Sequence, residues 1–95
     1  MNLEPELSEL LEADWSRDQV LQLFLDLVLG AEVQHVQLRT ATVDSTSTLA
    51  EAESAFIEGS AKAIQVRYRF ENEQWSDTIL PGDPTTKIIR SRMAV

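Results

Sequence analysis

The sequence predicts one α+β domain over residues 1–95. Its expected architecture is a two-layer sandwich, in which helices cover one face of a mainly antiparallel four-stranded sheet, in the order α-α-β-α-β-β-β. Two observations predict this class. Apolar residues recur at helical spacing in three segments and alternate with polar residues in four others. A chain of 95 residues, 43% of them hydrophobic, suits a single domain with a single core.

Two helices are expected before residue 30. Leucines at helical spacing beside glutamates predict a helix over residues 4–13. Ser16 and Gln19 have the spacing of a capping box, in which each side chain bonds the backbone N–H of the other residue. This spacing predicts a second helix over residues 17–29, which Gly30 would end.

The second helix is more apolar than a helix lying on a sheet needs to be. Eight of the ten residues from Val20 to Leu29 are apolar, and a polar stripe is formed by Asp18, Gln22 and Asp26. A helix that packs by one face needs an apolar arc of about 100° or a little more. Either the first helix covers the surplus, or a second copy of the protein does.

The rest of the chain predicts one more helix and four strands. Thr48 and Glu51 have a second capping-box spacing, before a helix that Gly59 would end. Alternating or β-branched segments predict strands over residues 33–43, 62–71, 74–80 and 87–93.

Three details of the connections follow from the same reasoning. Residues 44–48 are expected to be a polar connection, and Pro81-Gly82 a type II turn. Because a helix separates strands 33–43 and 62–71, this pair could be antiparallel, or parallel with a right-handed crossover.

The strand over residues 62–71 places two arginines on one surface. Side chains alternate along a strand, so Arg67 and Arg69 share a face opposite the apolar one. The same alternation puts His35 and Arg39 on this outer face, which would turn away from the helices. The simplest interpretation is a solvated surface that resists aggregation. The functional interpretation is a binding surface for an acidic protein or for a carboxylate or phosphate ligand.

A hairpin is expected between the strands 62–71 and 74–80. A tight loop at residues 72–73 would pair Phe70 with Trp75, Val66 with Ile79 and Tyr68 with Asp77. Asp77 then lies on the apolar face. Its carboxylate either reaches water at an irregular position, or accepts a buried hydrogen bond from Tyr68 in a small pocket, since an unpaired buried carboxylate is costly.

The composition argues against several classes of site. The chain has no cysteine, so disulfides, thiolate catalysis and the common structural zinc sites are absent. His35 is the only histidine and lies in no cluster of metal-ligand spacing, so no metal or cofactor is expected. The three glycines stand far apart and form no phosphate-binding loop. The missing cysteine, together with an N-terminus unlike a signal peptide, predicts a cytoplasmic location.

Net charge and hydropathy narrow the choice of partner. The formal net charge is −8, with the acids concentrated in residues 1–60. This charge argues against nucleic acid and against anionic membrane surfaces. The longest apolar segment has about ten residues, too few for a bilayer, which needs about 20.

We therefore expect a non-enzymatic protein-interaction module, whose partner is another protein or a second copy in a homodimer. Its surface would be the outer sheet face with Arg39, Arg67 and Arg69, or the apolar helix over residues 17–29. The alternative is a small-ligand-binding or simple acid–base enzyme domain, with a pocket near Tyr68 and Asp77 that His35 would join.

Overall fold

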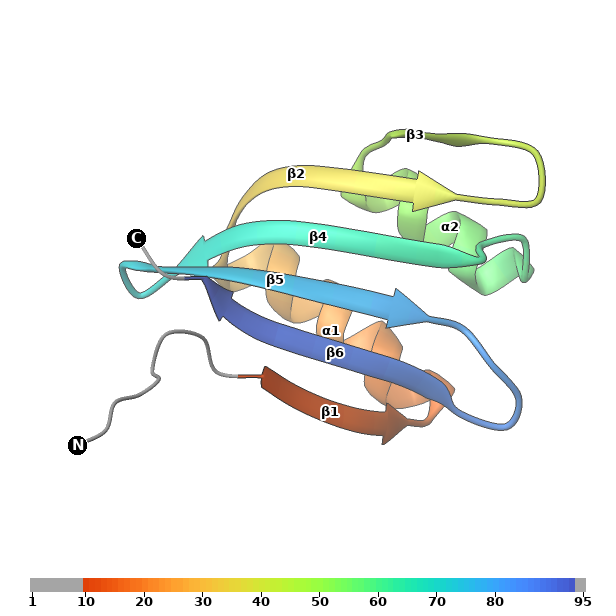
Figure 1. Ribbon diagram of the computed structural model, residues 1–95, viewed down its shortest axis with the longest axis horizontal. Helices are drawn as coiled ribbons and strands as arrows, with labels where there is room; N and C mark the ends of the chain where they lie inside the picture. Colours follow the sequence, from red (N-terminus) through yellow and green to blue (C-terminus); the bar gives the residue numbers. More distant parts are fainter. Residues whose placement is uncertain (1–9, 94–95) are drawn as a thin grey trace.

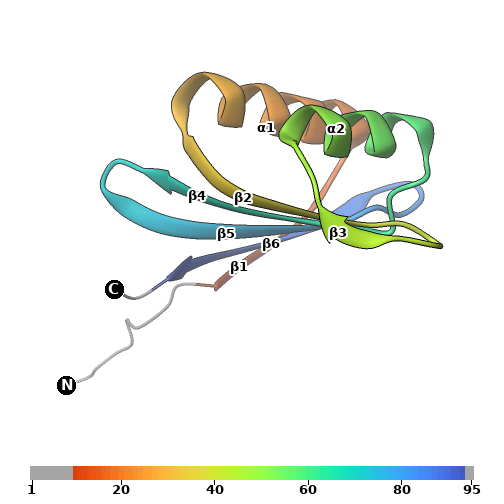
Figure 2. The ribbon, with the colours of Figure 1, turned by 90° about the horizontal axis from the view of Figure 1, so that it is seen from above.

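The sheet is larger than the sequence predicts. A computed structural model describes residues 10–93, and over this range two helices accompany one antiparallel six-stranded sheet of order β1-β6-β5-β4-β2-β3 (Figure 1). Both helices cover the same face of the sheet, and the other face carries no helix within the described range (Figure 2). The expected four-stranded sheet and the order α-α-β-α-β-β-β are therefore wrong. The observed order is β-α-β-β-α-β-β-β.

The expected helix over residues 4–13 is a strand where the structure describes it; residues 4–9 lie outside the described residues. β1 (Leu10–Trp15) pairs antiparallel with β6 (Thr86–Met93) along its whole length. Its sequence carries a second, two-residue period, because apolar residues at positions 11, 13 and 15 alternate with acids at 12 and 14. Pairing with β6 stabilises this alternation, and tertiary context outweighs the helical spacing of the leucines.

The helix expected over residues 17–29 is confirmed as α1 (Arg17–Gly30). The backbone N–H of Gln19 donates to the Ser16 hydroxyl at 3.3 Å, and the backbone N–H of Ser16 donates to the Gln19 side-chain oxygen at 2.9 Å. The capping box therefore forms. Residues at helical spacing turn one face of α1 into the core: Val20, Leu23, Phe24 and Leu27.

The strand expected over residues 33–43 is interrupted by a turn. β2 (Glu32–Arg39) ends before Thr40, whose hydroxyl accepts a hydrogen bond from the Val43 N–H at 3.1 Å. Local bonding of this kind by a threonine favours a turn over continued strand. The chain reverses, and β3 (Asp44–Thr46) pairs antiparallel with β2 in a segment expected to be a connection.

The third expected helix is confirmed as α2 (Leu49–Glu58). Thr48 and Glu51 form the predicted capping box. Gly59 ends the helix with φ = 84°, a left-handed conformation that glycine adopts without a steric penalty. Because Ala52, Ala55 and Phe56 turn inward, α2 packs beside α1 on the same side of the sheet.

β4 (Ala63–Phe70) and β5 (Glu73–Leu80) form the expected hairpin, but in a register displaced by two residues. Tyr68 lies opposite Trp75, and Val66 lies opposite Asp77, so the predicted Tyr68–Asp77 pair is wrong as a register. The turn is at residues 71–72, where φ is 51° and 65°. Two successive positive φ values are typical of the tightest hairpin loops.

A displacement of two residues leaves every side chain on its expected face. Within β4, Ile64, Val66 and Tyr68 are buried, whereas Arg67 and Arg69 are exposed on the outer face. The inside and outside of the sheet are therefore as the alternation predicts.

Two expectations about connections remain: the direction of the β2–β4 pair and the type II turn at Pro81-Gly82. β2 and β4 are antiparallel neighbours, so no parallel crossover is present between them. Gly82 does not have the positive φ that the predicted type II turn requires. Glycine is needed there because a Cβ would lie 2.7 Å from the Thr85 carbonyl oxygen.

The core lies between the two helices and the inner face of the sheet. It is apolar except for Asp77 and Thr86, which are buried among its side chains. The largest fully buried residues come from α1 and from the central strands: Phe24, Ile64, Ile79, Val20, Val66 and Asp77.

Candidate functional site

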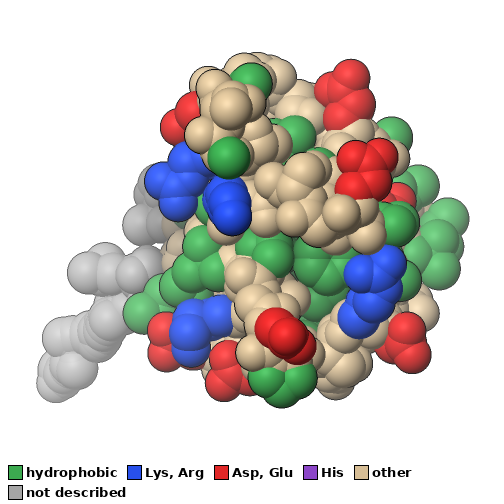
Figure 3. Space-filling view, turned by 90° about the vertical axis from the view of Figure 1, so that its right-hand side faces the viewer, with side chains coloured by type: hydrophobic (Ala, Val, Ile, Leu, Met, Phe, Trp, Pro, Cys, Tyr) green, Lys and Arg blue, Asp and Glu red, His purple; other side chains and the backbone are tan. Residues whose placement is uncertain are grey.

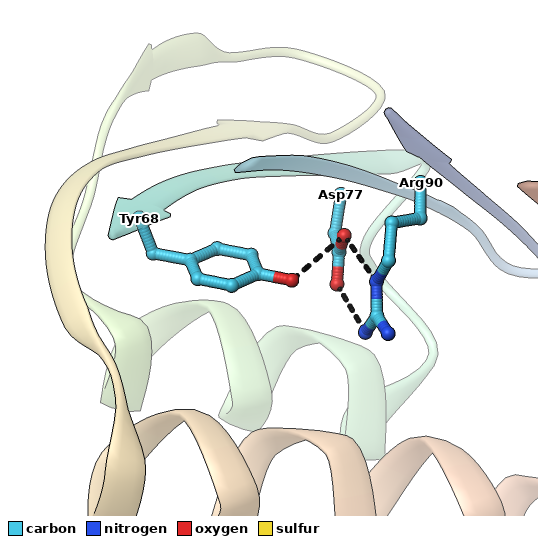
Figure 4. A network of polar contacts seen from close by, with 3 residues as sticks. All are labelled: Tyr68, Asp77 and Arg90. Carbon is cyan, nitrogen blue, oxygen red and sulfur yellow. Dashed lines mark hydrogen bonds and ion pairs between the residues drawn. The ribbon is translucent and has the colours of Figure 1, made fainter. Parts of the chain in front are cut away.

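A polar network lies inside this core, on three neighbouring strands. Tyr68 of β4, Asp77 of β5 and Arg90 of β6 all project from the sheet toward the helices (Figure 4). Arg90 lies directly opposite Asp77 in the β5–β6 register, and Tyr68 reaches Asp77 diagonally from β4. The strand pairing alone therefore brings the three side chains together.

The network supplies a charge partner and hydrogen bonds to the fully buried carboxylate of Asp77. Asp77 is 0% exposed, and Arg90 donates to it from Nε and from Nη2, each at 2.8 Å. The Tyr68 hydroxyl donates a third hydrogen bond to Asp77 Oδ1 at 3.1 Å. A buried carboxylate is tolerated only when it is paired and hydrogen-bonded, and the two-pronged guanidinium contact is among the strongest available pairings. Of the two interpretations of Asp77, the buried hydrogen bond to Tyr68 is the one observed.

The surroundings of the Tyr68 phenol and of the Arg90 guanidinium favour the protonated form of both groups. Burial raises the pKa of the Tyr68 phenol well above its usual value, and the nearby charge of Asp77 adds to the rise. The hydrogen bonds to Asp77 raise the pKa of the Arg90 guanidinium. A general acid or base works best with a pKa near the working pH. Tyr68 and Arg90 therefore suit hydrogen bonding to a ligand better than proton transfer.

A cleft of about 350 Å³ opens beside this network, between α1 and the sheet. Tyr68 and Arg90 reach it from the sheet, together with Phe70, which lies near the end of β4 and is 43% exposed. The α1 side supplies both polar and apolar side chains. The ten lining residues are Trp15, Gln19, Gln22, Leu23, Asp26, Leu27, Ala31, Tyr68, Phe70 and Arg90. A volume of this size with apolar walls and a few polar groups is typical of small-ligand sites.

The sheet separates the six predicted site residues into two groups. Tyr68 and Asp77 lie on the inner face, and Tyr68 lines the cleft. His35, Arg39, Arg67 and Arg69 lie on the outer face, where His35 is opposite Arg67 in the β2–β4 register. There His35 bonds the Gln37 side chain at 3.0 Å, and because it is on the outer face it does not join Tyr68 and Asp77 in a pocket.

Arg90 is the site residue that the sequence analysis missed. The β5–β6 register could have identified it. When residues 73–80 and 86–93 are aligned antiparallel, Asp77 and Arg90 lie opposite each other as a pair of opposite charges. The neighbouring indole N–H of Trp75 is buried and has no hydrogen-bond acceptor among the described residues.

A second surface feature is the outer side of α1. Leu25, Val28 and Leu29 are 48%, 63% and 75% exposed, although they belong to the most apolar segment of the chain. Figure 3 views the molecule from the end at which α1 begins, and hydrophobic side chains are also exposed at that end, beside acidic and basic ones. One explanation suggested by the sequence is that a helix over residues 4–13 covers the apolar surplus of α1. The described residues do not support this explanation, because residues 10–13 belong to β1 at the edge of the sheet.

The described residues and the comparisons add three negative findings. Neither helix in residues 10–93 is long and apolar enough to cross a membrane. Over the same range, no three His, Asp or Glu side chains are grouped so that they could hold a metal ion. No protein-family model, curated protein or solved structure matches this chain.

Proposed function

We propose that this chain is a non-enzymatic protein-interaction module, with the outer face of α1 as its interface and a second copy of the chain as its partner. The observation that carries the proposal is the exposure of an apolar stripe along α1. We call Leu21, Leu25, Val28 and Leu29 the α1 stripe.

The α1 stripe has no packing role that the described residues explain. The core takes its α1 contacts from the opposite face of the helix, and Leu21 alone among the stripe residues packs partly against that core. Solvent-exposed helix faces normally carry polar residues. A contiguous exposed apolar surface commonly marks a protein–protein contact.

The spacing of the leucines favours a second copy as the occupant. Leu21 and Leu29 lie four residues on either side of Leu25. If two α1 helices pack antiparallel about a two-fold axis through Leu25, that residue meets its own copy and Leu21 meets Leu29 of the other protomer. Contacts of this self-complementary kind are typical of two-fold dimers.

The strength of this contact follows from the exposed fractions. The exposure of Leu25, Val28 and Leu29 adds to about two complete side chains. Burying each complete side chain contributes about 1.5–3 kcal/mol, so the two protomers together gain about 6–12 kcal/mol. Association costs about 4–15 kcal/mol. The net gain is therefore at most about 8 kcal/mol, so the expected dimer is weak and reversible, with a dissociation constant no tighter than about micromolar.

Sedimentation equilibrium over a wide range of protein concentrations tests the proposal. Leu25→Glu should abolish the dimer, because it places two carboxylates at the two-fold axis. Val43→Glu is the matched control, since Val43 is 49% exposed and lies outside both helices. Added salt should strengthen the wild-type dimer by screening repulsion between two chains of charge −8. A monomer at every concentration, or equal weakening by both substitutions, would overturn the proposal.

The outer sheet face is a weaker candidate for the interface. Arg67 and Arg69 are exposed there, but their strand neighbours on that face are polar: Gln65, Ser76 and Gln74. Such a face offers little apolar area to bury. The cytoplasmic location expected from the cysteine-free sequence stays a prediction.

Small-ligand binding is the second candidate function, favoured by the cleft beside Tyr68 and Arg90. Its acid–base version receives no support, because the raised pKa of Tyr68 keeps the phenol protonated and His35 lies on the other face of the sheet.

A further inference from the structure

The guanidinium of Arg90 has an unused edge in the cleft. Its Nε–H and one Nη2–H bond Asp77, which leaves the Nη1 hydrogens and the second Nη2 hydrogen without an acceptor among residues 10–93. The side chain is 30% exposed and lines the cleft. Because Asp77 holds the guanidinium at two points, the free edge is a fixed pair of donors rather than a mobile charge.

The α1 side of the cleft supplies acceptors. Gln22 and Asp26 lie one turn apart on α1, and the Gln22 side-chain amide donates to Asp26 Oδ1 at 2.9 Å. Asp26 Oδ2 and the Gln22 side-chain oxygen form no hydrogen bond with the described residues. The cleft thus has fixed donors on the sheet and acceptors on the helix.

The walls of the cleft are largely apolar. Leu23 and Leu27 contribute aliphatic surface, and Trp15 and Phe70 contribute aromatic rings toward opposite ends of the cleft, since the registers place them on either side of Arg90. Aromatic and aliphatic walls bury the body of a ligand, and a few polar groups orient it.

The local charges select the ligand further. Asp77 already neutralises Arg90, whereas Asp26 forms no ion pair within the described residues. The net charge of the chain is also negative. An anionic ligand would gain from the Arg90 edge but would be repelled by Asp26, and a cationic ligand lacks the acceptor that Arg90 needs.

We propose that the cleft binds a small neutral carboxamide with an apolar body, its carbonyl accepting from Arg90 and its N–H donating to Asp26. A carboxamide places an acceptor and a donor side by side without a net charge. This site is separate from the α1 stripe, and the inference does not depend on self-association.

Three probes of the same shape test the proposal: benzamide, benzoate and benzamidinium. Each is titrated into the protein while backbone amide chemical shifts are recorded. Benzamide should shift residues around the cleft and bind about tenfold more tightly than benzoate, as expected for the loss of one hydrogen bond to a charged group. Benzamidinium, which has no acceptor for Arg90, should also bind more weakly.

Charge reversal on α1 provides the matched pair of variants. Asp26→Lys should reverse the preference, so that benzoate binds more tightly than benzamide. Asp18→Lys changes the same residue type two turns away on α1, outside the cleft lining, and should leave the order of the three probes unchanged. Both positions are exposed, so both variants are expected to fold.

Three results would overturn the proposal. The first is a shift of residues elsewhere in the sheet, the second is equal binding of all three probes, and the third is an effect of Asp18→Lys on the preference as large as that of Asp26→Lys. Because none of these results depends on the concentration of protein, failure of this site is distinguishable from failure of the α1 dimer.

Discussion

Replacing Arg90 with methionine removes the ionic partner of a fully buried carboxylate. Methionine keeps most of the length and apolar contacts of the arginine stem, so the variant isolates the loss of the guanidinium. Asp77 is 0% exposed and would retain one hydrogen bond, from Tyr68. Breaking a buried ion pair by removing one partner costs about 3–5 kcal/mol. We expect a loss near the lower end of that range, because Tyr68 still satisfies one lone pair.

Arg92 provides a matched control on the same strand. Its guanidinium lies 3.3 Å from Glu73, and the two side chains are 35% and 46% exposed. Surface pairs of this kind contribute about 0–1 kcal/mol. Arg92→Met should therefore reduce the free energy of unfolding by less than about 1 kcal/mol.

Urea unfolding followed by circular dichroism measures both losses. If Arg90→Met is too unstable to study, Asp77→Asn serves instead, with an expected loss of about 1–3 kcal/mol because Arg90 can still reach water. The triple change Tyr68→Phe, Asp77→Leu and Arg90→Met should restore most of the stability, since an apolar replacement leaves no unpaired group. Equal losses for Arg90→Met and Arg92→Met would refute the assignment of a buried pair.

Two further predictions concern titration and backbone conformation. Because the folded state raises the pKa of Tyr68, its contribution is complete below the unfolded value of about 10 and is lost as pH rises above it; unfolding experiments should show a steeper alkaline loss for wild type than for Tyr68→Phe. Gly59→Ala should destabilise the protein by about 1 kcal/mol because φ is 84° there. Gly30→Ala, in α1 with an ordinary contact distance of 3.8 Å to Phe70, should stabilise it by about 0.5–1 kcal/mol; thermal melts that show the same sign for both glycines would contradict this account.

Local capping signals predicted α1 and α2, whereas the edge strand β1 was wrongly predicted as a helix. The capping boxes at Ser16 and Thr48 depend on residues three apart, so the sequence contains all the information needed to place the start of α1 and α2. The strand β1 depends on pairing with β6, more than 70 residues away in the chain. Sequence periodicity alone could not choose between a helical and a strand interpretation of its leucines.

The hairpin shows which part of a register the sequence determines. Alternation fixed the faces of β4, because burial of one face makes a slip by one residue costly. It could not fix the displacement by two, since apolar residues meet across the sheet in either alignment. The turn residues Glu71 and Asn72 decided the outcome by adopting positive φ, and glutamate gives little sign of that conformation in a sequence.

The sequence identified only part of the candidate site. Tyr68 and Asp77 were identified because an acid on an apolar face needs a partner. Arg90 was missed because its role depends on the β5–β6 register. His35 does not join Tyr68 and Asp77, because strand alternation places it on the outer face, opposite Arg67.

The most direct test of the proposed function is a dilution series followed by backbone amide chemical shifts. The account predicts concentration-dependent shifts at Leu21, Leu25, Val28 and Leu29, with residues on the outer face of the sheet unchanged. Shifts confined to the face that carries Arg67 and Arg69, or no change at any concentration, would contradict it.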